Sequence, residues 1–418
     1  MAREHPSQQA NLFTKNRPSL FWRLVDPIVD ETLWTASALA SYQAVFGETA
    51  GTVDDLLNAT LGEGRFGPDH WKLSTAKRIY YELKPVLPRA LTRRMRQAYG
   101  RGNGIVAETA KWPIDDRFVN FLLLTLTGVL DLLGASDAVF IDFWPESKSW
   151  AFVLTHDVET AVGQSHVIDV ADLEARYGFR SSFSFIPERY QLDHGVINEL
   201  KDRGFEVGVH DLRHDGKLFR SRSRFNASAE QINRHATELG ATGFSAAYTH
   251  RNPEWMQALD FEYDLSFFDT DPYEPMPGGS LTIWPFFIGR FTELPYTLVQ
   301  DFTLTAVLGA TTHSIWTSKV EYIASRRGMA LLKSHPDYLL NPKTRSVYEQ
   351  FLAETANREH QPWHALPTDV ARWWRDRSSA GEATGLGRAT AAVIGTGGWG
   401  TIERASSGGY ERKPAKSG

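Results

Sequence analysis

The segment AFVLTHDVET, residues 151–160, decides the fold and also contains the first chemically notable side chains. An apolar run typical of a buried strand ends in His156, Asp157 and Glu159. Side chains alternate along a strand, so the two acids point to the same side of the chain and His156 points to the other. We therefore expect Asp157 and Glu159 to share a positive partner, and His156 to be a packed core residue.

Apolar runs of the same kind recur along the chain, with helical patterns between several of them. The strand-like runs are AVFIDFW (138–144), RSSFSFIP (180–187), FEVGVH (205–210), GFSAAY (243–248), YDLSFF (263–268) and MALLKSH (329–335). The helical patterns are HVIDVADLEARYG (166–178), GVINELKDRG (195–204) and SAEQINRHATELG (228–240), each ending at a glycine suited to a helix cap. This alternation predicts a parallel α/β sheet, either a barrel or a doubly wound sheet, with reactive side chains at the carboxyl ends of its strands.

The composition is that of a globular protein, with 42% hydrophobic and 23% charged residues among 418. A net charge of -5 gives no reason to expect a nucleic-acid partner. Because the chain has no cysteine, any transition metal must be bound by His, Asp or Glu. The start MAREHPSQQANLF lacks a signal-peptide pattern, so we expect a cytoplasmic protein. The apolar run 118–133 is short for a bilayer span and predicts a buried helix, so we expect no transmembrane segment.

Three regions are expected along the chain. Residues 1–135 read as a mainly helical N-terminal region, 136–375 as the barrel domain and 376–418 as a flexible tail rich in Gly and Ser. The basic run 89–104 is interpreted as a solvated helix face rather than a surface for lipid or phosphate. A small strand is expected within the tail at AAVIG, residues 391–395.

The partner of the two acids is expected in GVHDLRHDG, residues 208–216. His210 and His214 stand four apart, which brings both imidazoles to one side of a helical turn or tight loop. Two histidines and a carboxylate, with positions left open for water, form the ligand set of a catalytic zinc or a similar divalent ion.

Five segments together resemble a known family. They are LTHDVE (154–159), GFRSSFSFIPERY (178–190), FEVGVHDLRHDG (205–216), YDLSFFDTDPYEPMPGG (263–279) and LLKSHPDYL (331–339). In order and spacing they resemble the successive motifs of the NodB-type polysaccharide deacetylases, the carbohydrate esterase family 4 (CE4) superfamily. The resemblance covers about residues 148–340 and implies a distorted (β/α) barrel that uses a divalent metal, with zinc expected, to hydrolyse an N-acetyl or related amide on a sugar.

The resemblance also implies roles for individual residues. His210 and His214 match the two histidine ligands of the metal, Glu159 the acidic ligand and Asp157 the general base. In a second possible register of the motif, Asp157 binds the metal itself. His335 matches the late histidine that protonates the leaving amine as a general acid.

Two departures from the family pattern concern the surroundings of the general base. Ser245 stands where the family carries an arginine that orients this aspartate, and Ala247 stands where it carries a proline. Loss of a charge-assisted pair would leave the carboxylate less restrained. We interpret Arg251 or His250 as candidate substitutes for the missing cation.

The remaining expectations concern the substrate. Trp284, Arg251 and Asp269 are candidate substrate-binding residues, and Asp337 is a candidate orienting partner of His335. The expected function is removal of an acyl group from a sugar during polysaccharide or glycoconjugate biosynthesis, with association with glycan-assembly enzymes left open. Two alternatives stay open: an inactive barrel that binds glycans or acts as a scaffold, and a hydrolase of a non-sugar amide bond.

Overall fold

The structure is a computed structural model that describes residues 11–73, 111–379, 399–404 and 410–413. The basic run 89–104 and the strand expected at 391–395 lie outside these residues. In the described part, no helix is both long and apolar enough to cross a bilayer.

A largely parallel sheet forms the centre of the protein. Its strands run in the order β10-β3-β4-β5-β6-β7-β9-β8, and β11 also pairs with β3. All pairs are parallel except β8 with β9. The strands are β3 (Ala151–Val158), β4 (Ser182–Phe185), β5 (Glu206–His210), β6 (Gly243–Ser245), β7 (Tyr263–Asp264), β8 (Phe286–Ile288), β9 (Phe291–Glu293), β10 (Met329–Ser334) and β11 (Trp363–His364).

The sheet curls so that its two ends approach each other. The segment after β9 forms parallel bridges from Tyr296 to Phe268 and from Leu298 to Leu332 in β10, the strand at the opposite end of the sheet. Every residue of β3 and of β10 is buried, as expected for parallel strands covered on both faces. The prediction of an α/β fold with a distorted (β/α) barrel is therefore confirmed. Of the two architectures expected from the sequence, the sheet is the barrel and not the doubly wound sheet.

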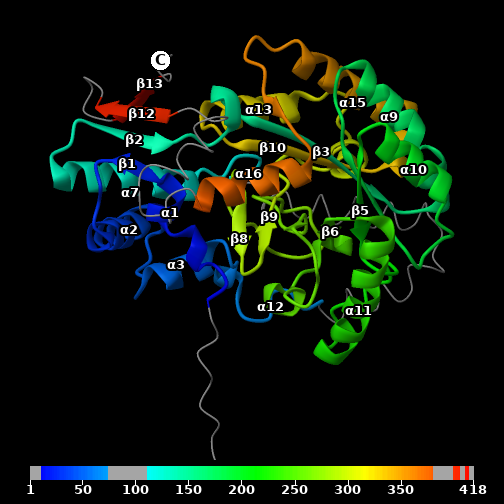
Figure 1. Cartoon of the computed structure of the whole chain (residues 1–418), viewed down its shortest axis with the longest axis horizontal. Coiled ribbons are helices and arrows are strands. Elements are labelled where there is room, and N and C mark those ends of the chain that lie inside the picture. The colour runs from blue at the N-terminus through cyan, green and yellow to red at the C-terminus, as the bar shows by residue number, and fades with distance from the viewer. Residues whose placement is uncertain (1–10, 74–110, 380–398, 405–409, 414–418) are drawn as a thin grey trace, which may run out of the picture.

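Helices cover the outside of the barrel. They are α8 (Ala161–Ser165), α9 (Val167–Arg176), α10 (His194–Asp202), α11 (Arg222–Leu239), α12 (Pro253–Met256), α13 (Ser314–Ser325), α14 (Pro336–Leu339), α15 (Pro342–Ala356) and α16 (Pro367–Ser379). Figure 1 shows α9, α10 and α15 along one outer side of the sheet. The three helices predicted from 166–178, 195–204 and 228–240 are present, and Gly240 takes the left-handed backbone conformation that ends α11.

The N-terminal region is mainly helical, as predicted. It contains α1 (Pro18–Trp22), α2 (Glu31–Phe46), α3 (Val53–Thr60) and α7 (Arg117–Leu133), with short 3-10 turns at Thr14–Asn16 and Gly64–Phe66. Helix α2 packs closely on α7 at Gly128. A side chain would not fit there, since a Cβ on Gly128 would lie only 2.4 Å from Oγ of Ser37. The apolar run 118–133 forms the predicted helix, with one face in the core.

A second, antiparallel sheet differs from the expectation. Strand β2 (Asp137–Ile141) was expected in the barrel, but it pairs with β1 (Leu24–Asp26) and β12 (Trp399–Arg404). β12 in turn pairs with β13 (Tyr410–Lys413), so this described part of the expected tail is a sheet, and α16 extends beyond the expected boundary at 375. These pairings join residues near both ends of the chain, a long-range contact that local sequence patterns do not specify.

Candidate functional site

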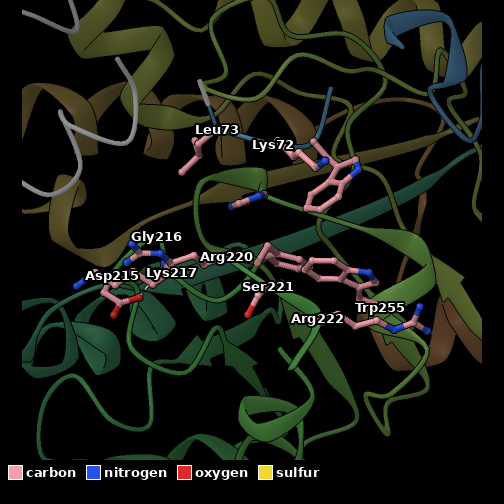
Figure 2. A pocket seen from close by; sticks show the side chains of 12 residues that line it. Lys72, Leu73, Asp215, Gly216, Lys217, Arg220, Ser221, Arg222 and Trp255 are labelled. Carbon is pink, nitrogen blue, oxygen red and sulfur yellow. Dashed lines mark hydrogen bonds between the residues drawn. The ribbon is translucent and has the colours of Figure 1, made fainter. Parts of the chain in front are cut away.

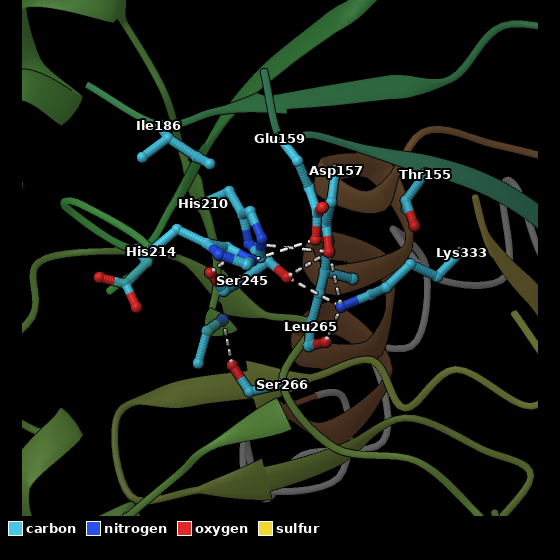
Figure 3. A network of polar contacts seen from close by, with 12 residues as sticks. Thr155, Asp157, Glu159, Ile186, His210, His214, Ser245, Leu265, Ser266 and Lys333 are labelled. Carbon is cyan, nitrogen blue, oxygen red and sulfur yellow. Dashed lines mark hydrogen bonds and ion pairs between the residues drawn. The ribbon is translucent and has the colours of Figure 1, made fainter. Parts of the chain in front are cut away.

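The carboxyl ends of β3, β5, β6 and β10 bring one cluster of polar side chains together. Figure 3 shows Asp157 and Glu159 pointing toward His210 and His214 on one side, with Lys333 on the other side of Asp157. The parallel pairing places these strand ends at the same rim of the barrel, which is where such folds hold their reactive groups.

Three side chains form a candidate metal-binding group. One ligand atom each from Glu159, His210 and His214 lies within 4.8 Å of the other two. Nε2 of His214 is 3.1 Å from Oε1 of Glu159, and the two imidazole rings have their centres 5.0 Å apart. Both histidines are buried, whereas the Glu159 side chain is 21% exposed. The group is therefore reachable from solvent on its glutamate side.

A strained loop after β5 turns the second histidine back toward the first. Asp211 and His214 both have positive φ, at 57° and 53°, a conformation that non-glycine residues adopt only at a cost. The Asp211 carboxylate accepts hydrogen bonds from the backbone N–H groups of Leu212 and Arg213, which stabilises the turn. The tight loop, rather than a helical turn, accounts for the convergence of the two imidazoles.

Hydrogen bonding determines which nitrogen of His210 is available to a ligand. Nδ1 lies 3.0 Å from the backbone carbonyl of Ser245, which can only accept, so Nδ1 carries the proton and Nε2 has a free lone pair. Burial, only partly offset by the charge of Asp157, lowers the pKa of His210 to about 4. A neutral imidazole with a free nitrogen is the form that binds a metal ion.

Asp157 is a buried carboxylate with one restrained oxygen. Its Oδ2 accepts a hydrogen bond of 3.2 Å from Oγ of Ser245 and lies 3.4 Å from Nζ of Lys333. Burial raises its pKa, but the charges of His210, Lys333 and His335 outweigh that effect, and the pKa stays below its usual value. Its Oδ1 is buried and accepts no hydrogen bond from the described residues.

Lys333 supplies a cation beside Asp157. It is only 1% exposed, and its Nζ donates to Oγ of Ser245 at 2.8 Å and to the carbonyl of Leu265 at 2.9 Å. The serine at the expected arginine position thus connects a lysine on β10 with Asp157 on β3. Sequence reasoning missed this residue, although a lysine within the otherwise apolar strand MALLKS was a signal of a buried charge.

The late histidine has a different partner from the one expected. Nδ1 of His335 lies 2.7 Å from Oδ1 of Asp301, and its backbone N–H donates to Oδ2 of the same carboxylate at 3.1 Å. Burial lowers the pKa of His335, but Asp301 overcomes this effect, with help from Glu159 and Asp157, and raises the pKa to about 9. The ring is therefore protonated at neutral pH. Asp301 was not predicted from the sequence.

Asp337, the expected partner of His335, binds elsewhere. Its carboxylate accepts the backbone N–H of Glu159 at 3.0 Å and the hydroxyl of Thr160. It therefore supports the chain at Glu159 instead of orienting the histidine ring.

The three candidate substrate-binding residues lie apart from this cluster. Trp284 is 2% exposed and donates its indole N–H to the carbonyl of Arg327 at 2.9 Å. Asp269 is buried and lies 2.7 Å from Nζ of Lys319. Both side chains belong to the interior, because neither presents its polar group to solvent.

Arg251 and His250 do not substitute for the missing arginine. The Arg251 guanidinium is buried, forms an ion pair with Glu63 and lies 4.7 Å from the ring centre of Phe267. The His250 ring packs against Phe219, 4.8 Å between ring centres. Arg251 instead joins the barrel to the N-terminal region through its ion pair with Glu63, which is 188 residues away in the sequence.

Fold and site together define an α/β barrel with a candidate histidine-histidine-glutamate metal centre at the carboxyl ends of its strands. No protein-family model matches the chain, and a search of curated proteins gives no match. Solved structures to which the chain is similar include a "probable polysaccharide deacetylase" from Pseudomonas aeruginosa, with 15% identity, a TM-score of 0.46 and coverage of 56% of this chain and 93% of that one.

Two further solved structures are also similar to part of this chain. PuuE allantoinase has 14% identity and a TM-score of 0.45, and the match covers 56% of this chain and 92% of that one. The peptidoglycan deacetylase PdaC from Bacillus subtilis has 12% identity and a TM-score of 0.36, with coverage of 56% and 96%. The likeness is a distant one of fold.

Proposed function

We propose that the protein is a metal-dependent hydrolase that removes an N-acetyl or similar acyl group from a sugar. One observation carries the proposal: the restrained, ionised carboxylate of Asp157 lies beside the Glu159, His210 and His214 group. The order of the five motifs supports an amide of a sugar as the substrate, within polysaccharide or glycoconjugate biosynthesis.

The side chains present fit a divalent ion, with zinc the ion proposed. His210 offers Nε2, and Nε2 of His214 lies 3.1 Å from the Glu159 carboxylate, so both imidazoles and the acid can reach one ion. Two neutral imidazoles and one carboxylate, with the remaining positions open, form a catalytic zinc ligand set. When bound, the ion supplies a Lewis acid that polarises the substrate carbonyl and lowers the pKa of water to ~7.

Asp157 is proposed as the general base. Ser245 and Lys333 hold its Oδ2, which leaves the unpartnered Oδ1 to accept the proton of the attacking water. Its lowered pKa keeps the carboxylate ionised at neutral pH, so the acceptor is ready before the substrate binds.

His335 is proposed as the general acid. Asp301 holds Nδ1 and favours the protonated ring, so Nε2–H is the proton available to the leaving amine. A base that is ionised and an acid that is protonated at the same pH form the pair that amide hydrolysis requires.

A direct assay tests the function. The full chain is loaded with zinc, and acetate release is measured from a panel of N-acetylhexosamines, free and phosphorylated, and from cyclic amides. We expect turnover of the sugars that Asp157→Asn lowers by roughly 10²–10⁴-fold with unchanged zinc content. The control Asp142→Asn alters a buried carboxylate that pairs with Arg327 away from the site, and should retain turnover.

Other outcomes identify the alternatives. Sugar binding without acetate release from any substrate would favour a glycan-binding protein, and release from cyclic amides alone would favour a non-sugar amidohydrolase. The cytoplasmic location stays a prediction that fractionation of the producing cells tests.

A further inference from the structure

A cavity of about 430 Å³ is lined in part by the residues that directly follow His214, and it has no role in the proposed chemistry. Figure 2 shows the side chains that line it. Its volume is within the range of small-molecule sites, about 300–1,000 Å³. Residues 71–73 of the N-terminal region form one side, and the loop 215–222, which directly follows His214, forms the other. His250 and Trp255 complete the lining.

Among the charged residues that line the cavity, cations outnumber acids. The cations that line it are Lys72, Lys217, Arg220 and Arg222. The one acidic residue of the lining is Asp215, and its carboxylate lies 3.9 Å from a guanidinium nitrogen of Arg224. The lining therefore carries a clear excess of positive charge in a chain whose net charge is -5.

Two of these cations are already paired at the surface. Lys72 lies 2.7 Å from the carboxylate of Asp69, and Arg222 lies 2.7 Å from that of Glu254. For Lys217 and Arg220, by contrast, no ion pair occurs with any carboxylate of the described residues. These two side chains are the ones that gain most from an incoming anion.

Aromatic rings form another part of the lining. Trp71 and Trp255 meet edge to face with their ring centres 4.8 Å apart, and Trp255 lies nearly parallel to Phe219 at 6.4 Å. Aromatic faces beside cations are suited to a ligand that has both a ring and a negative charge.

The cavity is connected to the metal-binding group through one tyrosine. The Tyr248 ring has its centre 4.4 Å from that of His214, and its hydroxyl donates to the His214 carbonyl at 3.1 Å. The same ring packs against the small apolar cluster of Leu73 and Met276, and Leu73 lines the cavity. Tyr248 therefore contacts both the metal-binding group and the border of the cavity.

We propose that this cavity binds a phosphate or pyrophosphate group that is linked to the substrate sugar, while the N-acyl group of the sugar lies at Glu159, His210 and His214. Lys217 and Arg220 bind the phosphate oxygens. The indoles of Trp71 and Trp255 contact the sugar ring to which the phosphate is attached. The inference rests on the proposed function for the position of the sugar, but the anion site itself does not depend on catalysis.

Binding of inorganic pyrophosphate tests the anion site separately from activity. Isothermal titration calorimetry uses the metal-free full chain, because pyrophosphate chelates divalent ions. The double variant Lys217→Ala, Arg220→Ala should weaken binding by about tenfold or more for each cation removed. The matched control Arg234→Ala, Lys343→Ala removes two exposed cations outside the cavity and should bind as the natural protein does. Equal affinities of the two double variants, or no binding to the natural protein, would overturn the inference.

Kinetics with matched substrates distinguishes this inference from the proposed function. The ratio of kcat/KM for N-acetylglucosamine 1-phosphate to that for N-acetylglucosamine should fall by at least about tenfold in the Lys217, Arg220 double variant, mainly through KM. An unchanged ratio in an active protein contradicts the phosphate site and leaves the hydrolase standing. Pyrophosphate binding that depends on the two cations, in a protein without turnover of any amide, supports the site and contradicts the hydrolase.

Discussion

Nζ of Lys333 lies 3.4 Å from Oδ2 of Asp157, and the two side chains are 1% and 3% exposed. A lysine from β10 thus supplies the cation that the motifs led us to expect from an arginine at position 245. Ser245 bridges the pair, because its hydroxyl accepts from Lys333 and donates to Asp157. The departure at Ser245 therefore changes which residue orients the carboxylate and does not leave the carboxylate unrestrained.

Replacing Lys333 by methionine should lower kcat by roughly tenfold to hundredfold with little change in zinc content. The carboxylate then loses one of the charges that help to keep it ionised, and it loses the cation beside its Oδ2. The variant should also lose about 3–5 kcal/mol of unfolding free energy, because a buried charge stays behind. The control Lys319→Met breaks a second buried lysine pair, with Asp269, and should lose stability without losing kcat per folded molecule. Equal kcat in both variants would exclude the positioning role.

Introducing arginine at position 245 should not improve the protein. Ser245 is fully buried and already contacts Lys333, so Ser245→Arg places a second cation in a space that one cation occupies. We expect a lower midpoint of thermal unfolding and lower activity. The double variant Ser245→Arg, Lys333→Leu should recover part of both, as measured by thermal unfolding and acetate release. A gain of activity in the single variant would instead indicate a decayed site.

The pH dependence of activity should report the His335 and Asp301 pair. The proposed acid must be protonated, so kcat/KM should fall above the His335 pKa of about 9, by tenfold for each further pH unit. The same raised pKa means that the pair stabilises the fold fully below pH 6.5, and that this stabilisation is lost as the pH rises through about 9.

Asp301→Asn tests whether the His335 and Asp301 pair causes the fall of kcat/KM at high pH, the alkaline limb of the pH profile. Without the negative charge, burial dominates and the pKa of His335 falls, so the alkaline limb should move to lower pH. Asp142→Asn, which removes a buried carboxylate elsewhere, should leave the limb in place. A limb that does not move in Asp301→Asn would mean that another group limits activity at high pH.

Arg251→Met should affect stability rather than catalysis. It breaks the buried pair with Glu63 between the N-terminal region and the barrel, so the unfolding free energy should fall by about 3–5 kcal/mol. Burial raises the pKa of Glu63, but Arg251 and the hydrogen bonds outweigh it and lower the pKa to about 2. The stabilisation is therefore fully present above pH 4.5 and lost as the pH falls toward 2. Denaturant titrations at pH 7 and pH 3 check both points, and a selective increase in KM would support substrate binding by Arg251 instead.

Much of the fold and the centre of the site followed from local patterns. Alternating strand and helix signals predicted the barrel, because strand and helix periods are local properties of the chain. The residues expected to gather at the strand ends, Asp157, Glu159, His210 and His214, do lie together, because parallel strands align their carboxyl ends.

Tertiary structure alone decided the partners of these groups and the roles of the remaining candidates. Lys333 and Ser245 are 88 residues apart, and Arg251 and Glu63 are 188 apart, so no spacing rule connects them. The same holds for the sheet in which β2 pairs with β1 and β12. It also holds for Trp284, because a tryptophan in the sequence can belong either to the core or to a pocket, and only the structure shows that it is buried. The sequence by itself determined which chemical groups stand at the strand ends. Only the packing of distant segments decided which charge each group meets, because ion pairing depends on distance in space and not along the chain.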